Sequence, residues 1–181
     1  MARISYPDSI DTAPAASQPF LTKVHGQLGS VPNLFRLVST SPAALEGFLG
    51  LSGALGKGTL GAKTGERIAL AVANVNHCTY CNSAHGYIAK NLVKLSDEEI
   101  EANRRGGSTD AAANAAVAFA KQVTETRGQV SAADLDAVRD AGFTDAQLVE
   151  IVAHVALNTL TNYVNEVFGT EVDFPVAAIA A

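Results

Sequence analysis

The feature that most constrains the fold is a series of helix start and stop signals that recurs from residue 41 onwards. Ser41 is followed by Pro42, which is the pattern of an N-cap and a first helical residue. Further along, Thr144 stands three residues before Gln147, as in a capping box, and Gly142 ends the preceding run. No segment alternates apolar and polar residues between hairpin turns, as the strands of a sheet do. The sequence therefore predicts an all-α fold with six to eight helices.

These signals also divide the chain. Residues 1–18 are rich in Pro, Ser and Ala, so we expect an extended arm there, followed by a single helical domain over residues 19–181. Ser96 and Glu99 are expected to form a capping box at the start of another helix. The expected helices cover about 42–56, 63–76, 81–91, 97–104, 110–127, 131–141 and 145–168.

Composition and net charge indicate which kinds of binding partner the protein can have. Only 17% of the residues are charged and 48% are apolar, so we expect much of the surface to be buried between the subunits of a homo-oligomer. The net charge of −5 and the lack of Lys or Arg runs argue against nucleic acid or an anionic membrane as a partner. The sequence shows neither an apolar secretory signal nor an apolar stretch that could cross a bilayer, so we expect a cytoplasmic protein.

The sulfur chemistry of the chain lies in one short stretch. Cys78 and Cys81 are its only cysteines, and His85 follows four residues later. If a helix begins near Cys78, all three side chains lie on one face. The dipole and the free N–H groups of such a helix start favour a thiolate, and His85 is close enough to Cys81 to exchange a proton with it. The pattern therefore favours a redox-active pair with an acid–base residue beside it.

Two other interpretations of the cysteine pair remain open. His77, Cys78, Cys81 and His85 are ligand types that zinc accepts, but structural zinc sites usually draw their ligands from two separated pairs. Adjacent residues such as His77 and Cys78 also point in different directions, so we expect His77 to be a helix-end or surface residue and expect no metal. The cysteines could alternatively be inert buried thiols. The spacing favours redox chemistry over both alternatives.

Glu66 is the candidate partner of His85. If the helices at 63–76 and 81–91 pack as a hairpin, the two side chains can meet near the connecting turn. A carboxylate in contact with His85 would orient the imidazole and raise its basicity. The competing interpretation is that Glu66 only stabilises the first turn of its helix, where the dipole favours a carboxylate.

Other polar residues are weaker candidates. Asn158 and Asn162 share a face of the last helix, with Asn165 nearby. Such amides usually hydrogen-bond across an interface, but they are also candidates to line a substrate pocket. His154 is expected to be a satisfied core or interface residue, and His25 is expected in a loop without a catalytic companion.

The spacing E-x11-C-x2-C-x3-H, formed by Glu66, Cys78, Cys81 and His85, resembles the signature of the AhpD-like alkylhydroperoxidases. These proteins belong to the carboxymuconolactone decarboxylase superfamily. The resemblance covers about residues 26–175. It includes GSVPNLFRLVSTSPAAL, which is similar to the first part of the peroxidase-related branch, and the later segments SDEEIEANRRGG, TRGQVSAADLDAVRDAGF and VALNTLTNYVNEVFGTEVDFP.

This resemblance implies an all-α, oligomeric peroxidase with the CxxC motif at a helix N-terminus. It implies that Cys81 is the peroxidatic thiol, that Cys78 is the resolving thiol, and that Glu66 and His85 relay the proton. The implied partners are a hydroperoxide substrate and a thiol or dithiol reductant. No haem, flavin or nicotinamide motif is visible in the sequence, and this chemistry needs no such cofactor.

One position departs from the family pattern. The characterised alkylhydroperoxidases carry a histidine between the two cysteines, where this chain has Tyr80. Tyrosine is a poor base at neutral pH but can donate a hydrogen bond, so Tyr80 joins Asn158 and Asn162 as a candidate for substrate binding.

Two functions compete with the peroxidase hypothesis. The first is a lyase that decarboxylates a small lactone acid, the activity for which the superfamily is named. It needs an acid–base site but no thiol pair, so the two cysteines argue against it. The second is a non-enzymatic oligomeric binding protein with a zinc site or an inert cysteine pair.

Overall fold

The structure is a computed structural model that describes residues 2–180. Over these residues the chain forms nine helices and no strand, which confirms the all-α prediction. Nine helices are more than the predicted six to eight, because two of them precede Ser41, where the first helix start was predicted. The helices are α1 (Gln18–Leu28), α2 (Asn33–Val38), α3 (Pro42–Leu55), α4 (Gly61–Val75), α5 (Thr79–Asn91), α6 (Asp97–Arg104), α7 (Ala111–Glu125), α8 (Ala132–Asp140) and α9 (Asp145–Phe168).

The first two helices lack the capping side chains that identify the later ones. Ser17 precedes α1 and Pro32 precedes α2, and neither residue makes a side-chain capping bond. Packing holds these helices instead, because Leu21 of α1 and Leu34 of α2 are buried in the same apolar cluster. Their start points are therefore weakly marked in the sequence.

The capping signals of the later helices are largely confirmed. Ser41 Oγ accepts the N–H of Ala44 at the start of α3, and Thr144 forms a full capping box at the start of α9. At α6 only half of the expected box forms. Ser96 Oγ accepts the Glu99 N–H at 3.1 Å, but the Glu99 carboxylate does not bind the Ser96 N–H and instead binds Asn103 of its own helix and partners outside it.

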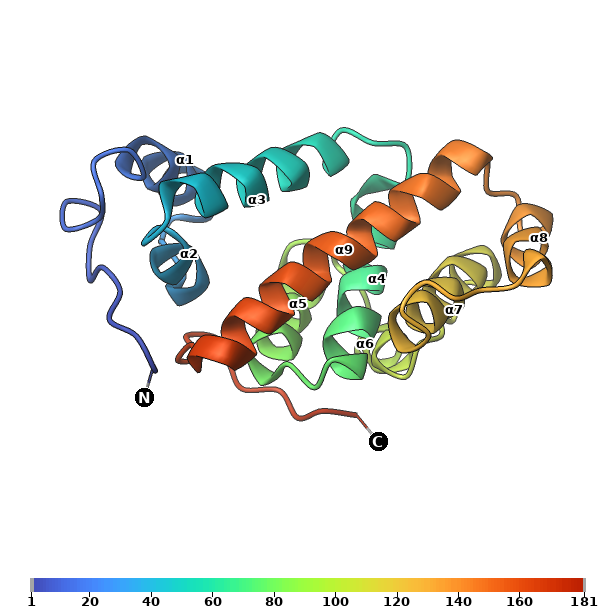
Figure 1. Cartoon of the computed structure of the whole chain (residues 1–181). Helices are drawn as coiled ribbons and strands as arrows, with labels where there is room; N and C mark the ends of the chain where they lie inside the picture. Colours follow the sequence, from blue (N-terminus) through green and yellow to red (C-terminus); the bar gives the residue numbers. More distant parts are fainter. Residues whose placement is uncertain (1, 181) are drawn as a thin grey trace.

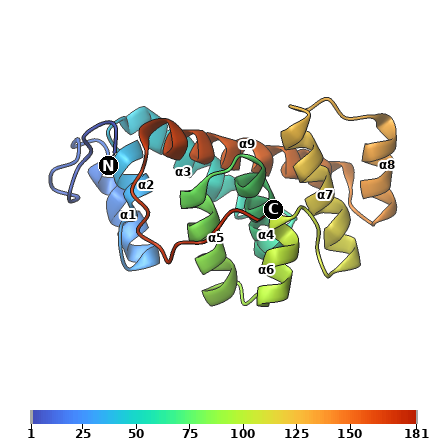
Figure 2. The same ribbon diagram turned by 90° about the horizontal axis from the view of Figure 1, so that it is seen from below.

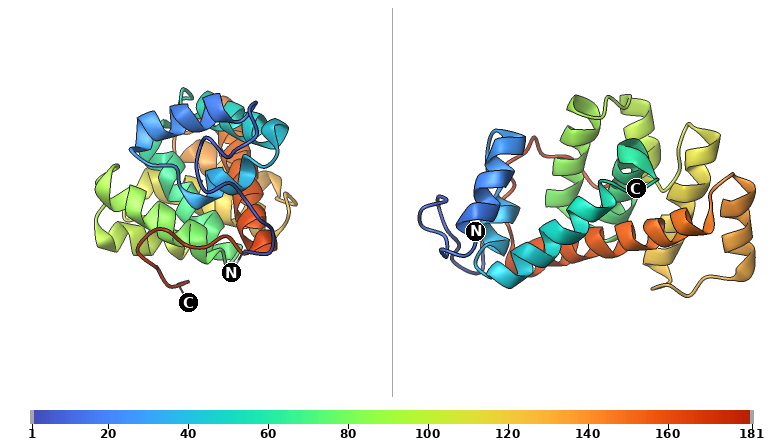
Figure 3. Two further views of the ribbon diagram at one scale, coloured as in Figure 1. Left: turned by 90° about the vertical axis from the view of Figure 1, so that its left-hand side faces the viewer. Right: turned by 90° about the horizontal axis from the view of Figure 1, so that it is seen from above.

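α9 runs along most of the length of the molecule (Figure 1), and it packs against α2, α3, α4, α5, α7 and α8. α4 is the central element, because it contacts α5, α6, α7 and α9. Seen from below, α5, α6 and α7 follow one another along the molecule (Figure 2). α1 and α2 lie at one end and α8 lies at the other (Figure 3).

Two large apolar clusters form the core on either side of α4. One is built on α4, α7, α8 and α9 around Ile68 and Ile151, which are fully buried. The other joins α1, α2 and α3 to α5, and it contains both Cys78 and Cys81. The cysteines therefore lie inside the protein, next to the helices that the sequence marks least clearly.

Both ends of the described chain pack against helices. The Arg3 N–H donates to the Phe168 carbonyl at the end of α9, at 2.7 Å. After α9 the chain has no regular secondary structure and passes across α5 (Figure 2), where the Ala177 N–H donates to Ser83 Oγ at 2.9 Å. This C-terminal segment therefore covers the helix that carries Cys81.

The division into an arm over residues 1–18 and a domain over residues 19–181 remains a prediction. Its end residues, Met1 and Ala181, lie outside the part of the chain that the structure describes. Within that part, no helix has the length and apolar character needed to cross a membrane.

A buried polar cluster around Glu99 fastens α6 to its neighbours. Glu99 Oε1 lies 2.6 Å from Arg67 Nε on α4, and Oε2 accepts the Thr109 N–H at 2.7 Å. Burial would raise the pKa of Glu99, but hydrogen bonds from Ser108, Thr109 and Asn103 outweigh burial and lower the pKa to about 2. The ionised carboxylate therefore holds the segment before α7 against α4 and α6.

We expect Glu99→Gln to lower the free energy of unfolding by about 3 kcal/mol at pH 7, because the Arg67 charge loses its buried anion. The folded-state pKa lies below the unfolded value of about 4.3, so the carboxylate stabilises the fold above that pH. This stabilisation is lost as the pH falls towards 2. Urea unfolding at pH 7 and pH 3 measures the effect. The difference in the free energy of unfolding between the unmodified protein and Glu99→Gln should be about half as large at pH 3 as at pH 7.

The matched control is Glu101→Gln, because Glu101 lies on the same helix with a side chain 42% exposed. Exposed ion pairs contribute little, so this variant should change the stability by less than about 1 kcal/mol. Equal losses in the two variants would show that the Glu99 cluster does not fasten α6.

Candidate active site

The turn between α4 and α5 places the cysteine pair. α4 ends in a Schellman motif, in which the Cys78 N–H donates to the Ala73 carbonyl and the His77 N–H donates to the Asn74 carbonyl, both at 3.0 Å. His77 adopts a left-handed conformation with φ of 54°, in the position that glycine usually occupies. The chain therefore reverses within two residues, and α5 begins directly after Cys78.

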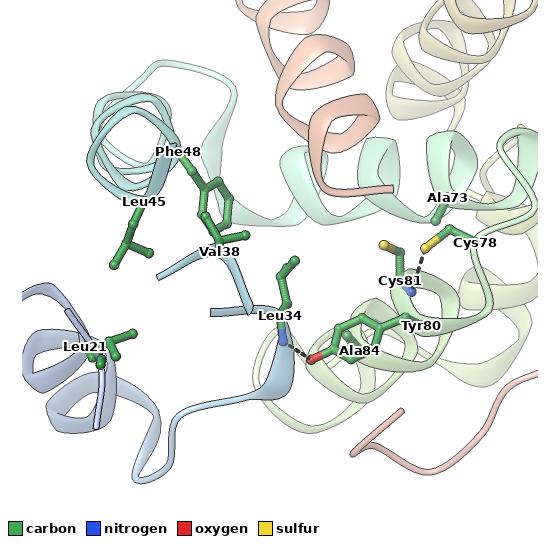
Figure 4. Close-up of a cluster of buried hydrophobic side chains, with 11 residues drawn as sticks. Leu21, Leu34, Val38, Leu45, Phe48, Ala73, Cys78, Tyr80, Cys81 and Ala84 are labelled. Carbon is green, nitrogen blue, oxygen red and sulfur yellow. Dashed lines mark hydrogen bonds between the residues drawn. The ribbon is translucent and has the colours of Figure 1, made fainter. Parts of the chain in front are cut away.

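Cys78 caps the helix that carries Cys81. Its Sγ accepts the Cys81 N–H at 3.2 Å, as Figure 4 shows. The CxxC motif thus lies at a helix N-terminus, as expected. Both cysteines are free thiols and buried.

A cavity of about 300 Å³ opens beside Cys81. Cys81 and His85 lie in its wall, whereas Cys78 does not and is fully buried. The rest of the wall comes from α1, α2, α3, α5, α9 and the C-terminal segment. It is mostly apolar and includes Leu34, Phe35, Phe48, Ile88, Leu157 and Phe174. Of the two sulfur atoms, that of Cys81 is therefore the one placed for a ligand in the cavity.

Glu66 and His85 are in contact. Glu66 Oε1 lies 2.8 Å from His85 Nδ1, with side chains 12% and 23% exposed. α4 begins at Gly61, so Glu66 lies in the second turn and no acidic residue occupies the first turn. The interpretation of Glu66 as a first-turn dipole partner is therefore wrong, because the helix starts earlier than the sequence suggested. Since Nδ1 binds Glu66, Nε2 is the His85 nitrogen left for other groups.

His85 and Cys81 each stabilise the charged form of the other. Burial would lower the pKa of His85, but the Glu66 carboxylate and the Cys81 sulfur raise it above the ordinary value. Burial would raise the pKa of Cys81, but a hydrogen bond from Cys78, the charge of His85 and the amides of two α9 residues lower it to about 7. The arrangement therefore favours an imidazolium next to a thiolate.

Cys78 has the opposite character. Its hydrogen bond to Cys81, together with burial, raises the pKa of Cys78. Of the two cysteines, Cys81 is therefore the one that ionises near neutral pH, and Cys78 remains a thiol that donates to it.

Three asparagines of α9 face this region, and the structure gives each a different role. Asn158 lines the cavity, as proposed, and its Nδ2 donates to the His154 carbonyl. Asn162 does not line the cavity; its Oδ1 accepts from Asn76 Nδ2 at 2.9 Å. Asn165 was not selected from the sequence, yet its Nδ2 donates to Cys81 Sγ at 3.2 Å. The sequence feature that could have indicated Asn165 is the spacing of the three asparagines, which places them on one face of the helix.

Tyr80 lines the cavity with its ring, but its hydroxyl is occupied. The hydroxyl donates to Asp173 Oδ1 at 2.8 Å. It also accepts the Leu34 N–H at 3.1 Å, the bond drawn in Figure 4. The ring packs edge-on against Phe174, with centroids 5.8 Å apart. In this chain the residue between the cysteines therefore ties α2 and the C-terminal segment to α5.

The remaining histidines lie outside this arrangement. His77 is exposed at the end of α4, as expected. His154 is partly buried, packs against Gly65 of α4, and has its pKa lowered by burial. His25 was expected in a loop, but it lies exposed in the last turn of α1. Among residues 2–180, no three His, Cys, Asp or Glu side chains are grouped so that they could hold a metal ion.

Comparison with known proteins gives one family and several similar structures. Residues 42–126 match the carboxymuconolactone decarboxylase family. A search of curated proteins finds no significant match.

Several solved structures share nearly the whole fold of the chain. One, described as an alkylhydroperoxidase AhpD core and an uncharacterized peroxidase-related protein, is from Ralstonia eutropha JMP134. It is 27% identical, with a TM-score of 0.84 over 95% of this chain and 92% of that chain. An uncharacterized peroxidase-related protein from Silicibacter sp. TM1040 is 25% identical, with a TM-score of 0.81 over 94% and 91%. The debrominase Bmp8 is 18% identical, with a TM-score of 0.76 over 93% and 90%, and shows the fold alone.

Proposed function

Because the chain belongs to the carboxymuconolactone decarboxylase superfamily, among its AhpD-like, peroxidase-related proteins, we propose that it is a thiol-dependent peroxidase. It reduces a hydroperoxide through Cys81 and Cys78 and oxidises a thiol or dithiol reductant. The observation that carries the proposal is the position of Cys81 in the cavity wall, next to the imidazole of His85. No cofactor takes part in the proposed reaction.

The first step uses the charges around Cys81. The thiolate attacks the terminal oxygen of the hydroperoxide, the S–O bond forms and the O–O bond breaks. The leaving alkoxide takes a proton from His85, whose imidazolium is held by Glu66. The products are an alcohol and a sulfenic acid on Cys81, so the peroxide has gained the two electrons that the sulfur has lost.

The second step uses the proximity of Cys78. Its thiol attacks the sulfenic sulfur, forming a disulfide with Cys81 and releasing water. The proton of Cys78 passes to the departing hydroxide, directly or through His85. An external dithiol then reduces the disulfide and restores both thiols. A reducing compartment such as the cytoplasm would supply that donor.

The cavity wall favours this reaction over lactone decarboxylation. A lactone acid carries a carboxylate, and proteins usually bind carboxylates through Arg or Lys. None of the described residues that line the cavity is Arg or Lys, and most are apolar. The cationic side chain among these lining residues is His85, whose imidazolium is already paired with Glu66 and the Cys81 thiolate. A lyase acting on a small acid therefore lacks a free anion-binding group here, whereas an uncharged hydroperoxide needs none.

The direct test is steady-state turnover with cumene hydroperoxide and dithiothreitol. The proposal predicts that the protein consumes dithiothreitol in proportion to the hydroperoxide added, forming one cumyl alcohol per disulfide. Dithiothreitol consumption no faster than without protein, or unchanged in the Cys78→Ser, Cys81→Ser double variant, would contradict the proposal.

We further propose that the protein is a homo-oligomer. Apolar side chains of α9 are exposed along one face, including Val152, Leu160, Tyr163 and Val167, each at least 45% exposed. They line a groove between α7 and α9, and such a surface is unusual on a soluble monomer. We expect an oligomer at micromolar concentration in analytical ultracentrifugation, and Tyr163→Glu should weaken it. A stable folded monomer of the unmodified chain would contradict this prediction.

A further inference from the structure

Asn165 makes an unusual contact for a side chain in a protein core. It is 2% exposed, and its Nδ2 donates to Cys81 Sγ at 3.2 Å, across 84 residues of sequence. Its Oδ1 is buried and has no hydrogen-bond partner among the described residues. Among residues 2–180, the sulfur atom is therefore the one hydrogen-bond partner of this side-chain amide.

Asn162, one turn earlier on α9, lies beside the same sulfur. Its Oδ1 accepts from Asn76 Nδ2 at 2.9 Å, which fixes the orientation of the amide. Its Nδ2 is buried without a partner, although the amide is near enough to lower the pKa of Cys81. Neither asparagine lines the cavity, so neither occupies the space of a substrate.

Packing alone does not account for these amides. A buried N–H without a partner destabilises a protein, and an apolar residue of the same size would avoid that cost. An N–H next to a sulfur is a weak donor–acceptor pair while the sulfur is a thiol, but it becomes a charge-assisted hydrogen bond when the sulfur is ionised. The amides therefore match the ionised form of Cys81 and not the neutral one.

We propose that Asn165, assisted by Asn162, is a catalytic residue that binds the Cys81 sulfur as a thiolate and holds it in the cavity wall. This inference deepens the proposed peroxidase function and rests on it for its role in turnover. His85 contributes charge, Asn165 contributes a hydrogen bond, and the amide of Asn162 adds its dipole nearby. Together they replace the water molecules that would solvate a thiolate at the protein surface.

The test measures ionisation of Cys81 without any peroxide. In a Cys78→Ser background, Cys81 is the only thiol, and its alkylation by iodoacetamide as a function of pH reports the thiolate. We expect Asn165→Leu, which keeps the volume and removes the donor, to shift this profile upward by about one pH unit. Starting from a pKa of about 7, alkylation at pH 7 should become about fivefold slower, because the thiolate fraction falls from about one half to about one tenth. Asn165→Asp should shift the profile further, because it places a second anion beside the sulfur.

The packing control is Leu45→Ala in the same background. Leu45 is fully buried in the apolar cluster that contains Cys81, but it belongs to α3 and donates no hydrogen bond to the sulfur. This variant should lower the melting temperature and leave the alkylation profile unchanged. If Asn165→Asp does not fold, the comparison of Asn165→Leu with Leu45→Ala is sufficient.

An alkylation profile of Asn165→Leu that coincides with the unmodified background would overturn the inference and leave Asn165 as a packing residue. That result would leave the peroxidase proposal standing, because turnover is measured separately. Conversely, a shifted profile in a protein that does not reduce peroxides would support the thiolate site and reject the proposed reaction.

Discussion

Replacing Cys81 with serine should reduce the rate of hydroperoxide reduction by at least about a thousandfold, because the alcohol of serine cannot replace the thiolate as a nucleophile. The structure makes Cys81 the reactive residue for two reasons. Its sulfur lies in the cavity wall, and its pKa is lowered to about 7, whereas Cys78 is shut off from the cavity and has a raised pKa. Stopped-flow mixing with cumene hydroperoxide measures the rate.

Cys78→Ser should give a different defect. The first oxidation should still occur, but the sulfenic acid on Cys81 should persist, because no second thiol can condense with it. Trapping with dimedone and mass measurement would detect it, and steady-state turnover should be lost. If Cys78→Ser eliminated the first oxidation and Cys81→Ser spared it, the roles of the two cysteines would be reversed.

Glu66→Gln and His85→Ala should each slow the first oxidation by about a hundredfold, because the two groups work as one acid–base unit. The 2.8 Å contact between Glu66 and His85 orients the imidazole and favours its charged form, which in turn stabilises the Cys81 thiolate. Because they act through one another, the double variant should be little slower than the slower single variant. Rapid mixing of the four proteins at one pH gives the comparison.

The oxidation rate of His85→Ala should depend on pH in a predictable direction. The positive charge of His85 lowers the pKa of Cys81, so removing it raises that pKa and reduces the thiolate fraction at pH 7. The rate of His85→Ala should therefore recover in part as the pH is raised above neutral. Losses that add in the double variant, with an unchanged pH profile, would mean that Glu66 and His85 do not act on Cys81.

The fold was predictable where capping side chains mark the helix boundaries. Ser41 and Thr144 cap α3 and α9 as expected, because an N-cap depends on residues only three positions apart. α1 and α2 carry no capping bond and are held by long-range packing, so local signals did not reveal them. Long-range contacts also explain why the Ser96 capping box is incomplete. Arg67 and Thr109 bind the Glu99 carboxylate, which would otherwise accept the Ser96 N–H.

The candidate site shows the same division between local and distant contacts. Cys78, Cys81 and His85 share one turn and one helix, and Glu66 comes from the adjacent helix of a hairpin, so their proximity followed from spacing. Asn165 approaches Cys81 from α9, 84 residues away, and no local pattern indicates which of the α9 amides reaches the sulfur.

Tyr80 illustrates how tertiary contacts redirect a side chain. From the sequence it was a candidate to bind substrate in place of the family histidine. In the structure its hydroxyl joins Asp173 to the Leu34 N–H, and these partners lie 93 and 46 residues away. The position between the cysteines therefore supports the wall of the cavity, and the aromatic ring is its remaining contribution to the cavity surface.

The measurement that tests the central claim most directly is a single oxidation of the reduced protein with one equivalent of cumene hydroperoxide. Thiol titration before and after should show the loss of two thiols per chain. Peptide mass should show that two hydrogens are lost within the one peptide that contains Cys78 and Cys81. Two intact thiols after complete mixing, or disulfides mainly between chains, would contradict a peroxidase that works through this pair.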